Sequence, residues 1–107
     1  MSTSVSIGLC RDRHAFPEEV EKCIYGEIKD PMDIKGLERR ADELFKSLKV
    51  QNTDLKEVSL YVTGLSTALC AAINAAKKNK IKLILNHYNI ATRGYVQQKM
   101  QIGRAHV

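Results

Sequence analysis

Short apolar runs alternate with segments of helical periodicity along the chain. The strand-like runs are rich in apolar residues and bounded by polar ones, and they cover residues 5–10, 22–28, 58–62, 82–89 and 94–100. Between the second and third runs, apolar residues recur every three or four positions from Ile34 to Leu48, which is the spacing of an amphipathic helix. A second helix is predicted over residues 66–79, almost directly after the third run. The expected order is therefore β-β-α-β-α-β-β.

This order indicates the fold class. Strands and helices that alternate through short connections form parallel sheets with right-handed crossovers. The chain is thus expected to adopt a small Rossmann-like α/β fold, with a mostly parallel sheet of four to five strands and two helices. Its 107 residues suffice for one domain with a modest core.

Each helix carries signals for where it begins and what it packs against. Asp30 and Pro31 are expected to open the first helix, because aspartate caps a helix N-terminus and proline fits its first turn. The second helix is expected to face the core with Leu65, Leu69, Ile73 and Ala76. Its remaining small residues form a second face, at Ala68, Ala71, Ala72 and Ala75. Such a face allows close packing on the sheet or on a second copy of the chain.

Charge and cysteine content narrow the class of protein. The formal net charge is +5, and no acidic residue follows Glu57. This asymmetry predicts a basic surface suited to an anionic partner, and lysines solvated at a helix end are the alternative. Three cysteines without a C-x-x-C spacing favour reduced thiols and a cytoplasmic protein. No apolar run reaches the roughly 18–20 residues of a membrane span, so no membrane partner is expected.

The last six residues need a separate interpretation. IGRAHV, residues 102–107, is what one reading frame of a widely used sequencing adapter encodes. We therefore predict adapter read-through at the end of a metagenomic reading frame, and a natural chain that continues past Gln101. The single domain is assigned to residues 1–101, and the tail is left out of functional reasoning.

Two polar segments follow the first and third predicted strands, at residues 11–14 and 63–67. Ligands of parallel α/β sheets bind beyond the carboxyl ends of the strands, and a glycine before a helix N-terminus lets a phosphate approach the backbone. The sequence therefore predicts a phosphate-containing ligand between these segments, although TGLST matches neither the Walker loop nor the G-x-G-x-x-G fingerprint. The residues expected to contact the ligand are Arg11, Arg13, Thr63, Gly64, Leu65, Ser66 and Thr67. The alternative is that Ser66 or Thr67 only caps the helix.

The segment LYVTGLSTALCAAINAAKKNKIKLILNHYN resembles the second conserved region of the CRISPR-associated Rossmann-fold (CARF) domains. In that family a strand ending in a Thr-Gly or Ser-Gly step leads into a helix, and the next strand ends in an aromatic or histidine-containing segment. The resemblance covers residues 58–89 and implies a homodimer that binds a cyclic oligoadenylate across its two-fold axis, with ring cleavage in some members of this antiviral defence family. This chain has Leu65 and Ser66 where the family commonly has a second glycine and a lysine. It carries no effector domain, which suits a stand-alone ring nuclease or a cyclic-nucleotide sponge.

Ring cleavage of this kind requires no metal and no cofactor, because a ribose 2′-hydroxyl attacks the adjacent phosphorus in line. His14 is predicted as the catalytic residue that moves the proton, and an ordinary loop histidine is the alternative. His87 and Tyr88 are predicted to bind the ligand, the tyrosine by stacking on a base. The alternatives are a histidine satisfied by a hydrogen bond and a tyrosine that packs at the strand end.

The expected partners are the cyclic oligonucleotide and a second copy of the chain, with no stable duplex nucleic acid. An interpretation from another class is a protein-interaction module, such as a phage-encoded inhibitor or a toxin–antitoxin partner. In that case the Thr-Gly step has only a structural role.

Overall fold

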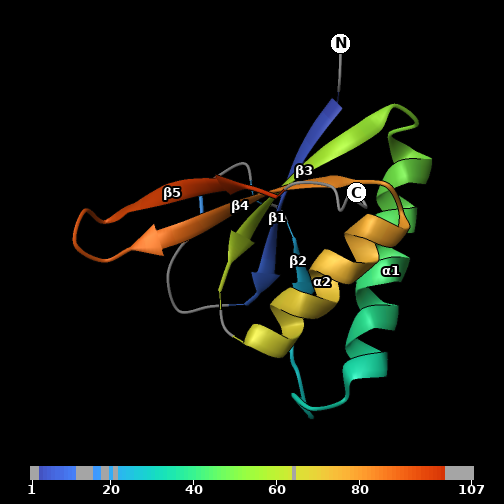
Figure 1. Cartoon of the computed structure of the whole chain (residues 1–107), viewed down its shortest axis with the longest axis horizontal. Helices are drawn as coiled ribbons and strands as arrows, with labels where there is room; N and C mark the ends of the chain where they lie inside the picture. Colours follow the sequence, from blue (N-terminus) through green and yellow to red (C-terminus); the bar gives the residue numbers. More distant parts are fainter. Residues whose placement is uncertain (1–2, 12–15, 18–19, 21, 64, 101–107) are drawn as a thin grey trace, which may run out of the picture.

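Five strands form one sheet in the order β2-β1-β3-β4-β5, and two helices cover it (Figure 1). The computed structural model describes residues 3–11, 16–17, 20, 22–63 and 65–100. The elements are β1 (Thr3–Cys10), β2 (Cys23–Tyr25), α1 (Ile34–Gln51), β3 (Leu55–Val62), α2 (Ser66–Lys78), β4 (Lys82–Asn89) and β5 (Gly94–Lys99). The predicted order is confirmed, and so is the small Rossmann-like α/β fold.

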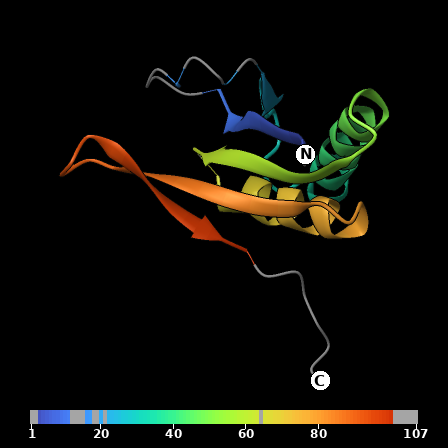
Figure 2. The ribbon, with the colours of Figure 1, turned by 90° about the horizontal axis from the view of Figure 1, so that it is seen from above.

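The sheet is mostly parallel. Strands β2, β1, β3 and β4 run parallel, and β5 returns antiparallel to β4 as a hairpin. The β2–α1–β3 and β3–α2–β4 crossovers both advance toward β5, and right-handed crossovers that advance in one direction place their helices on one face. Figures 1 and 2 show α1 and α2 side by side on that face.

The core lies between this face and the helices. Ile7, Leu60 and Leu85 are cross-strand neighbours on β1, β3 and β4, and all three are buried. The apolar stripe of α1 packs over the sheet through Leu37, Ala41, Phe45 and Leu48. Burying a large apolar side chain contributes about 1.5–3 kcal/mol to the free energy of folding, so this layer is the main source of stability.

The predicted core face of α2 is only partly correct. The buried residues of the helix are Ala68, Ala71, Ala72, Ala75 and Ala76. Leu65 is 39% exposed, and Leu69 and Ile73 pack only at the edge of the core. Because α2 packs on the sheet and also against α1, small side chains let the backbones approach and the bulkier ones remain at the margin.

The start of α1 also differs from the prediction. Helix α1 begins at Ile34 with Asp33 as its N-cap, whose Oδ1 accepts a hydrogen bond from the Gly36 N–H at 3.2 Å. Asp30 instead accepts from the Met32 N–H in the preceding turn. The helix therefore starts three residues later than Pro31 indicated. Within the described part of the chain, neither helix combines the length and apolar character needed to cross a membrane.

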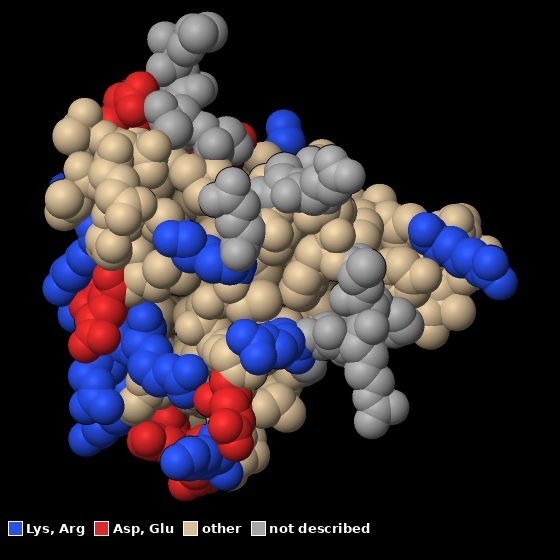
Figure 3. All heavy atoms as spheres, turned by 180° about the vertical axis from the view of Figure 1, so that it is seen from behind, with Lys and Arg blue, Asp and Glu red and all other residues tan. Residues whose placement is uncertain are grey.

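The opposite face of the sheet is built differently. Residues on alternate positions point to it, among them Gly8, Tyr61 and Asn86, which are cross-strand neighbours on β1, β3 and β4. Phe16, from the connection between β1 and β2, packs on Gly8, where an added Cβ would lie 2.9 Å from its Cζ. Viewed from this side in Figure 3, charged side chains gather mainly toward α1, and the surface toward the β4–β5 hairpin is mostly uncharged.

Candidate functional site

The carboxyl ends of β1 and β3 are joined by the side chain of Thr63. Its Oγ1 accepts a hydrogen bond from the Cys10 N–H at 3.1 Å and donates to the Cys10 carbonyl at 2.6 Å. Thr63 is buried, and its hydroxyl acts both as the acceptor and as the donor in these two bonds. The two polar segments predicted to hold the ligand therefore start side by side, and the hydrogen bonds of Thr63 connect them.

Arg11 follows directly on Cys10 at this edge of the sheet. Its N–H donates to the Tyr25 carbonyl at 3.2 Å, which extends the pairing of β1 with β2 by one residue. Its side chain is exposed, and its positive charge acts on Cys23, where it opposes the burial that raises the pKa of that thiol. The guanidinium is thus held beside β2 and open to solvent.

The N-terminus of α2 has no side-chain cap. Its N-cap is Leu65 in an extended conformation (φ −82°, ψ 139°), and none of the described side chains caps the first turn. The alternative in which Ser66 or Thr67 caps the helix is wrong, because the Thr67 hydroxyl donates to the Pro31 carbonyl at 2.7 Å and Ser66 lies inside the first turn.

By helix geometry, the N–H groups of Ser66, Thr67 and Ala68 have no acceptor within the helix. No acidic residue occupies the first turn. The positive end of the helix dipole is therefore not neutralised by the side chains of its own first turn.

The two ligand candidates on β4 point to opposite faces of the sheet. His87 lies on the helix-covered face, next to Val62, and its Nε2 is 2.9 Å from Gln98 Oε1 on β5. Tyr88 lies on the other face, where its ring packs edge-to-face on Tyr95 with centroids 5.4 Å apart. One ligand at the strand ends cannot meet both side chains from the same side. Arg13, His14 and Gly64, like the tail at 102–107, lie outside the described residues.

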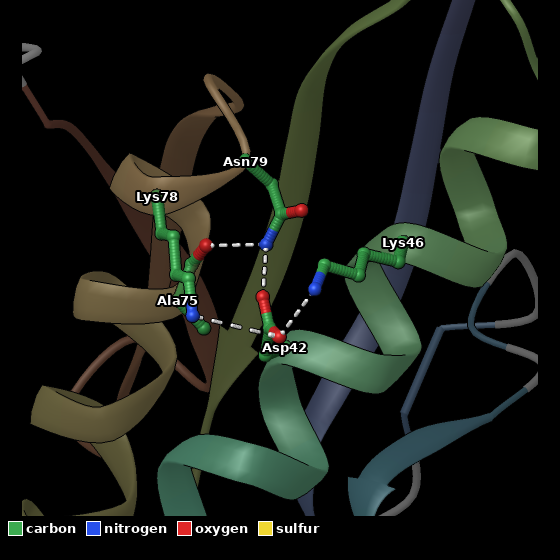
Figure 4. Close-up of polar contacts among 5 residues, drawn as sticks. All are labelled: Asp42, Lys46, Ala75, Lys78 and Asn79. Atoms are coloured by element: carbon green, nitrogen blue, oxygen red, sulfur yellow. Dashed lines mark hydrogen bonds and ion pairs between the residues drawn. The ribbon is translucent and has the colours of Figure 1, made fainter.

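A polar seam joins α1 to α2 away from this edge (Figure 4). Asp42 accepts a hydrogen bond from Asn79 Nδ2 at 2.7 Å and pairs with Lys46 Nζ at 3.0 Å. The Asn79 hydrogen bond, then the bond from Lys46, holds the pKa of Asp42 below its usual range. Asn79 Nδ2 also donates to the Ala75 carbonyl, and the Asn79 carbonyl accepts from Lys49. The seam fixes the packing of the two helices.

The β4–β5 side of the opposite face carries residues that sequence reasoning did not select. Tyr61 and Tyr95 meet edge-to-face with centroids 4.9 Å apart, and Phe16 lies 6.4 Å from Tyr61. Asn86 is buried between these strands. The available signal was the polar residue within the apolar run LILN, followed two positions later on the same strand by Tyr88.

The fold and the strand-end geometry define the class of this protein as a small Rossmann-like α/β domain. Comparisons of the chain with models of protein families, with curated proteins and with solved structures found no match.

Proposed function

We propose that the protein binds a cyclic oligonucleotide of the cyclic oligoadenylate type at the carboxyl edge of its sheet. A phosphate of the ligand lies at the N-terminus of α2, and the Arg11 guanidinium neutralises part of its charge. The observation that carries this proposal is the first turn of α2, which has no side-chain cap and follows Thr63, the residue bonded to Cys10 just before Arg11.

The binding groups follow from the chemistry of phosphate. The first N–H groups of α2 donate to its oxygens, with the Ser66 hydroxyl as a further donor from the exposed first turn. Thr63 and Thr67 position this turn and do not contact the ligand, because their hydroxyls already donate to Cys10 and Pro31. The dimer and the ligand's symmetry belong to the proposal through the resemblance to CARF domains.

Sequestration and cleavage are the two modes of action of such a site. In cleavage, a ribose 2′-hydroxyl attacks the neighbouring phosphorus, the P–O5′ bond breaks, and the products are a 2′,3′-cyclic phosphate and a free 5′-hydroxyl. His14 moves the proton from the attacking hydroxyl, and Arg11 stabilises charge on the phosphate. The strand-end site needs no metal ion for this reaction.

A protein-interaction module is the second candidate function. Ile90 and Val96, on the β4–β5 hairpin, are 80% and 53% exposed. Large exposed apolar side chains on a projecting hairpin favour contact with another protein. This function requires no nucleotide.

The decisive experiment is a titration with cyclic di-, tri-, tetra- and hexa-adenylate, read by thermal shift and by chromatography of the nucleotide afterwards. We expect one ring size to raise the melting temperature. Arg11→Gln should weaken its binding about 10-fold or more, the loss of a charge-assisted contact. Arg39→Gln, the same change on the exposed surface of α1, is the matched control and should leave binding unchanged.

The outcomes separate the candidate functions. A linear product that His14→Ala abolishes identifies a ring nuclease, and bound but intact ligand identifies a sponge. If Arg11→Gln and Arg39→Gln weakened ligand binding equally, the loss would come from the lower net charge and not from a contact of Arg11. No shift with any ring contradicts the proposal and favours the interaction module.

A further inference from the structure

Asn86 carries a buried amide nitrogen that has no hydrogen-bond partner in the part of the chain that the structure describes. The residue is 3% exposed, and its Nδ2 is the one buried side-chain nitrogen or oxygen without a hydrogen bond among the described residues. Leaving such a donor unpaired costs about 1–3 kcal/mol, and an apolar residue at this place would avoid that cost. An orphaned donor in the middle of a strand therefore calls for a physical reason.

The amide lies within an aromatic cluster, which we define as Phe16, Tyr61, Tyr88 and Tyr95. Asn86 pairs with Tyr61 on β3 and with Gln97 on β5, and the next pair on the same face of the hairpin is Tyr88 and Tyr95. The rings meet edge-to-face, with interplanar angles between 66° and 88°. All four aromatic side chains are only partly buried, so the cluster faces solvent on one side and covers the amide on the other.

The cluster adjoins the phosphate site of the proposed function. Tyr61 lies near the end of β3, and Thr63 follows the last residue of that strand, about 7 Å from Tyr61 along extended backbone. Thr63 holds the two segments of the strand-end site together. A ligand anchored there by its phosphate can reach the cluster with its base.

We propose that the aromatic cluster and Asn86 form a nucleobase site that reads the base of the ligand. A base packs against the tyrosine rings, since every base has a π-face that aromatic side chains bind. One ring swings aside, and Asn86 Nδ2 donates to an acceptor on the base edge. Adenine offers ring nitrogens as acceptors, which matches a free donor. This inference rests on the proposed function only for the phosphate that anchors the same ligand.

The choice of a base follows from the chemistry of the site. An aliphatic partner would leave the amide unpaired. A peptide would have to add along a strand edge, whereas Asn86 lies on β4 with a paired strand on each side. A flat ring with an acceptor at its edge satisfies both the aromatic side chains and the donor.

The experiment uses adenosine and inorganic phosphate as separate probes of the full chain. Amide NMR spectra report on the side-chain NH₂ of Asn86 and on the backbone of the first turn of α2. Tyrosine fluorescence gives a second readout, because the chain has no tryptophan and three of its four tyrosines lie in the cluster. We expect adenosine to shift the Asn86 side-chain signals and to change the fluorescence, and phosphate to shift only the α2 turn.

Two variants test the roles of the ring and the amide. Tyr88→Ala should weaken adenosine binding about 10-fold. Asn86→Leu should weaken it about 5-fold or more and also raise the melting temperature of the free protein by about 4 °C or more, since the orphaned donor is gone. Asn74→Leu, the same substitution on an exposed position of α2, is the control and should leave adenosine binding unchanged.

A higher melting temperature together with weaker adenosine binding in Asn86→Leu would show that Asn86 serves recognition and not stability. A lower melting temperature in Asn86→Leu would mean that a buried water satisfies the amide, and it would overturn the inference. Phosphate shifts at α2 without any adenosine effect would also overturn it, while leaving the proposed phosphate site intact. Adenosine effects without phosphate shifts would support the base site and contradict the proposed function.

Discussion

Leu60 and Tyr61 are neighbours on β3, and they point to opposite faces of the sheet with different surroundings. Leu60 is fully buried between Ile7 and Leu85 in the layer that α1 and α2 cover. Tyr61 is half-buried, and its contacts are other aromatic rings rather than a helix. The first face gains its free energy from close packing, whereas the second leaves aromatic side chains within reach of a ligand.

Polar groups differ between the two faces in the same way. On the helix side, Asn79 is paired with Asp42 and with the last turn of α2. On the other side, Asn86 is more deeply buried than Asn79, and its Nδ2 has no acceptor among the described residues. Unsatisfied buried polar groups are expected mainly at functional sites, so this difference supports the proposed base site on the second face.

The largest expected effect tests the packing of the helix-covered face. Phe45→Ala removes a fully buried ring between α1 and the sheet and should lower the free energy of unfolding by about 3–5 kcal/mol. Tyr95→Ala, the matched loss of a ring on the other face, should cost about 1.5 kcal/mol or less, because its ring is half exposed. Urea denaturation of both variants measures the difference.

Equal losses in the two variants would contradict the asymmetry. Phe45→Leu keeps most of the side-chain volume and should retain a cooperative transition at a cost below about 1.5 kcal/mol. This variant keeps the comparison measurable if Phe45→Ala does not fold.

The polar seam provides an intermediate effect. Asn79→Ala removes the hydrogen bonds to Asp42 and to the Ala75 carbonyl, and it should cost about 1–2 kcal/mol at neutral pH. Asn74→Ala, which removes only an exposed bond to Glu38, should cost less than about 0.5 kcal/mol.

The seam should also respond to acid. The pKa of Asp42 is lowered in the folded state, so its contribution to stability is present above the ordinary carboxyl pKa of about 3.9 and is lost as the pH falls through the lowered value. Because Asn79 is the main cause of that shift, Asn79→Ala should raise the pKa of Asp42, as carboxyl NMR titration would detect. An unchanged Asp42 titration would show that Lys46 dominates instead.

The fold followed from the sequence wherever periodicity was long and regular. Strand β4 occupies residues 82–89 as predicted, and α1 has its apolar stripe facing the sheet. The prediction was too long for β2, which spans only Cys23–Tyr25, because an edge strand with a single partner ends where its pairing with β1 ends. The prediction placed the larger apolar residues of α2 in the core, but its alanines are buried there. The sequence of one helix does not show how closely that helix packs on the sheet.

The candidate site was predictable only in outline. Thr63 bonds to Cys10, the residue before Arg11, so the two predicted segments start at neighbouring strand ends as expected. The role of Thr63 was not predictable, since its hydrogen-bond partner Cys10 is 53 residues away in the sequence. The pairing of Tyr61 with Asn86 likewise depends on the strand register, and the hydrophobic pattern alone does not determine which residues of two strands pair.

The smallest expected effect compares tyrosines on the two sides. Tyr25 is fully buried beside α1, and its hydroxyl donates to the Leu37 carbonyl at 2.7 Å. Tyr25→Phe should cost about 0.5–1.5 kcal/mol at neutral pH, because the buried hydrogen bond to that carbonyl is lost. Burial raises the pKa of Tyr25 to about 12, although the Arg40 guanidinium, 5.0 Å from the ring centroid, opposes the shift.

The sign of the pH dependence follows from this raised pKa. The unfolded tyrosine ionises near the ordinary value of about 10, so the contribution of Tyr25 is complete below that pH and is lost as the pH rises toward 12. The stability difference between the native protein and Tyr25→Phe should therefore narrow between these values, as denaturation at a series of alkaline pH values would measure. Tyr88→Phe, on the exposed cluster, is the control. If Tyr88→Phe altered the alkaline profile as much as Tyr25→Phe, the contrast between a structural tyrosine and a ligand-facing one would not hold.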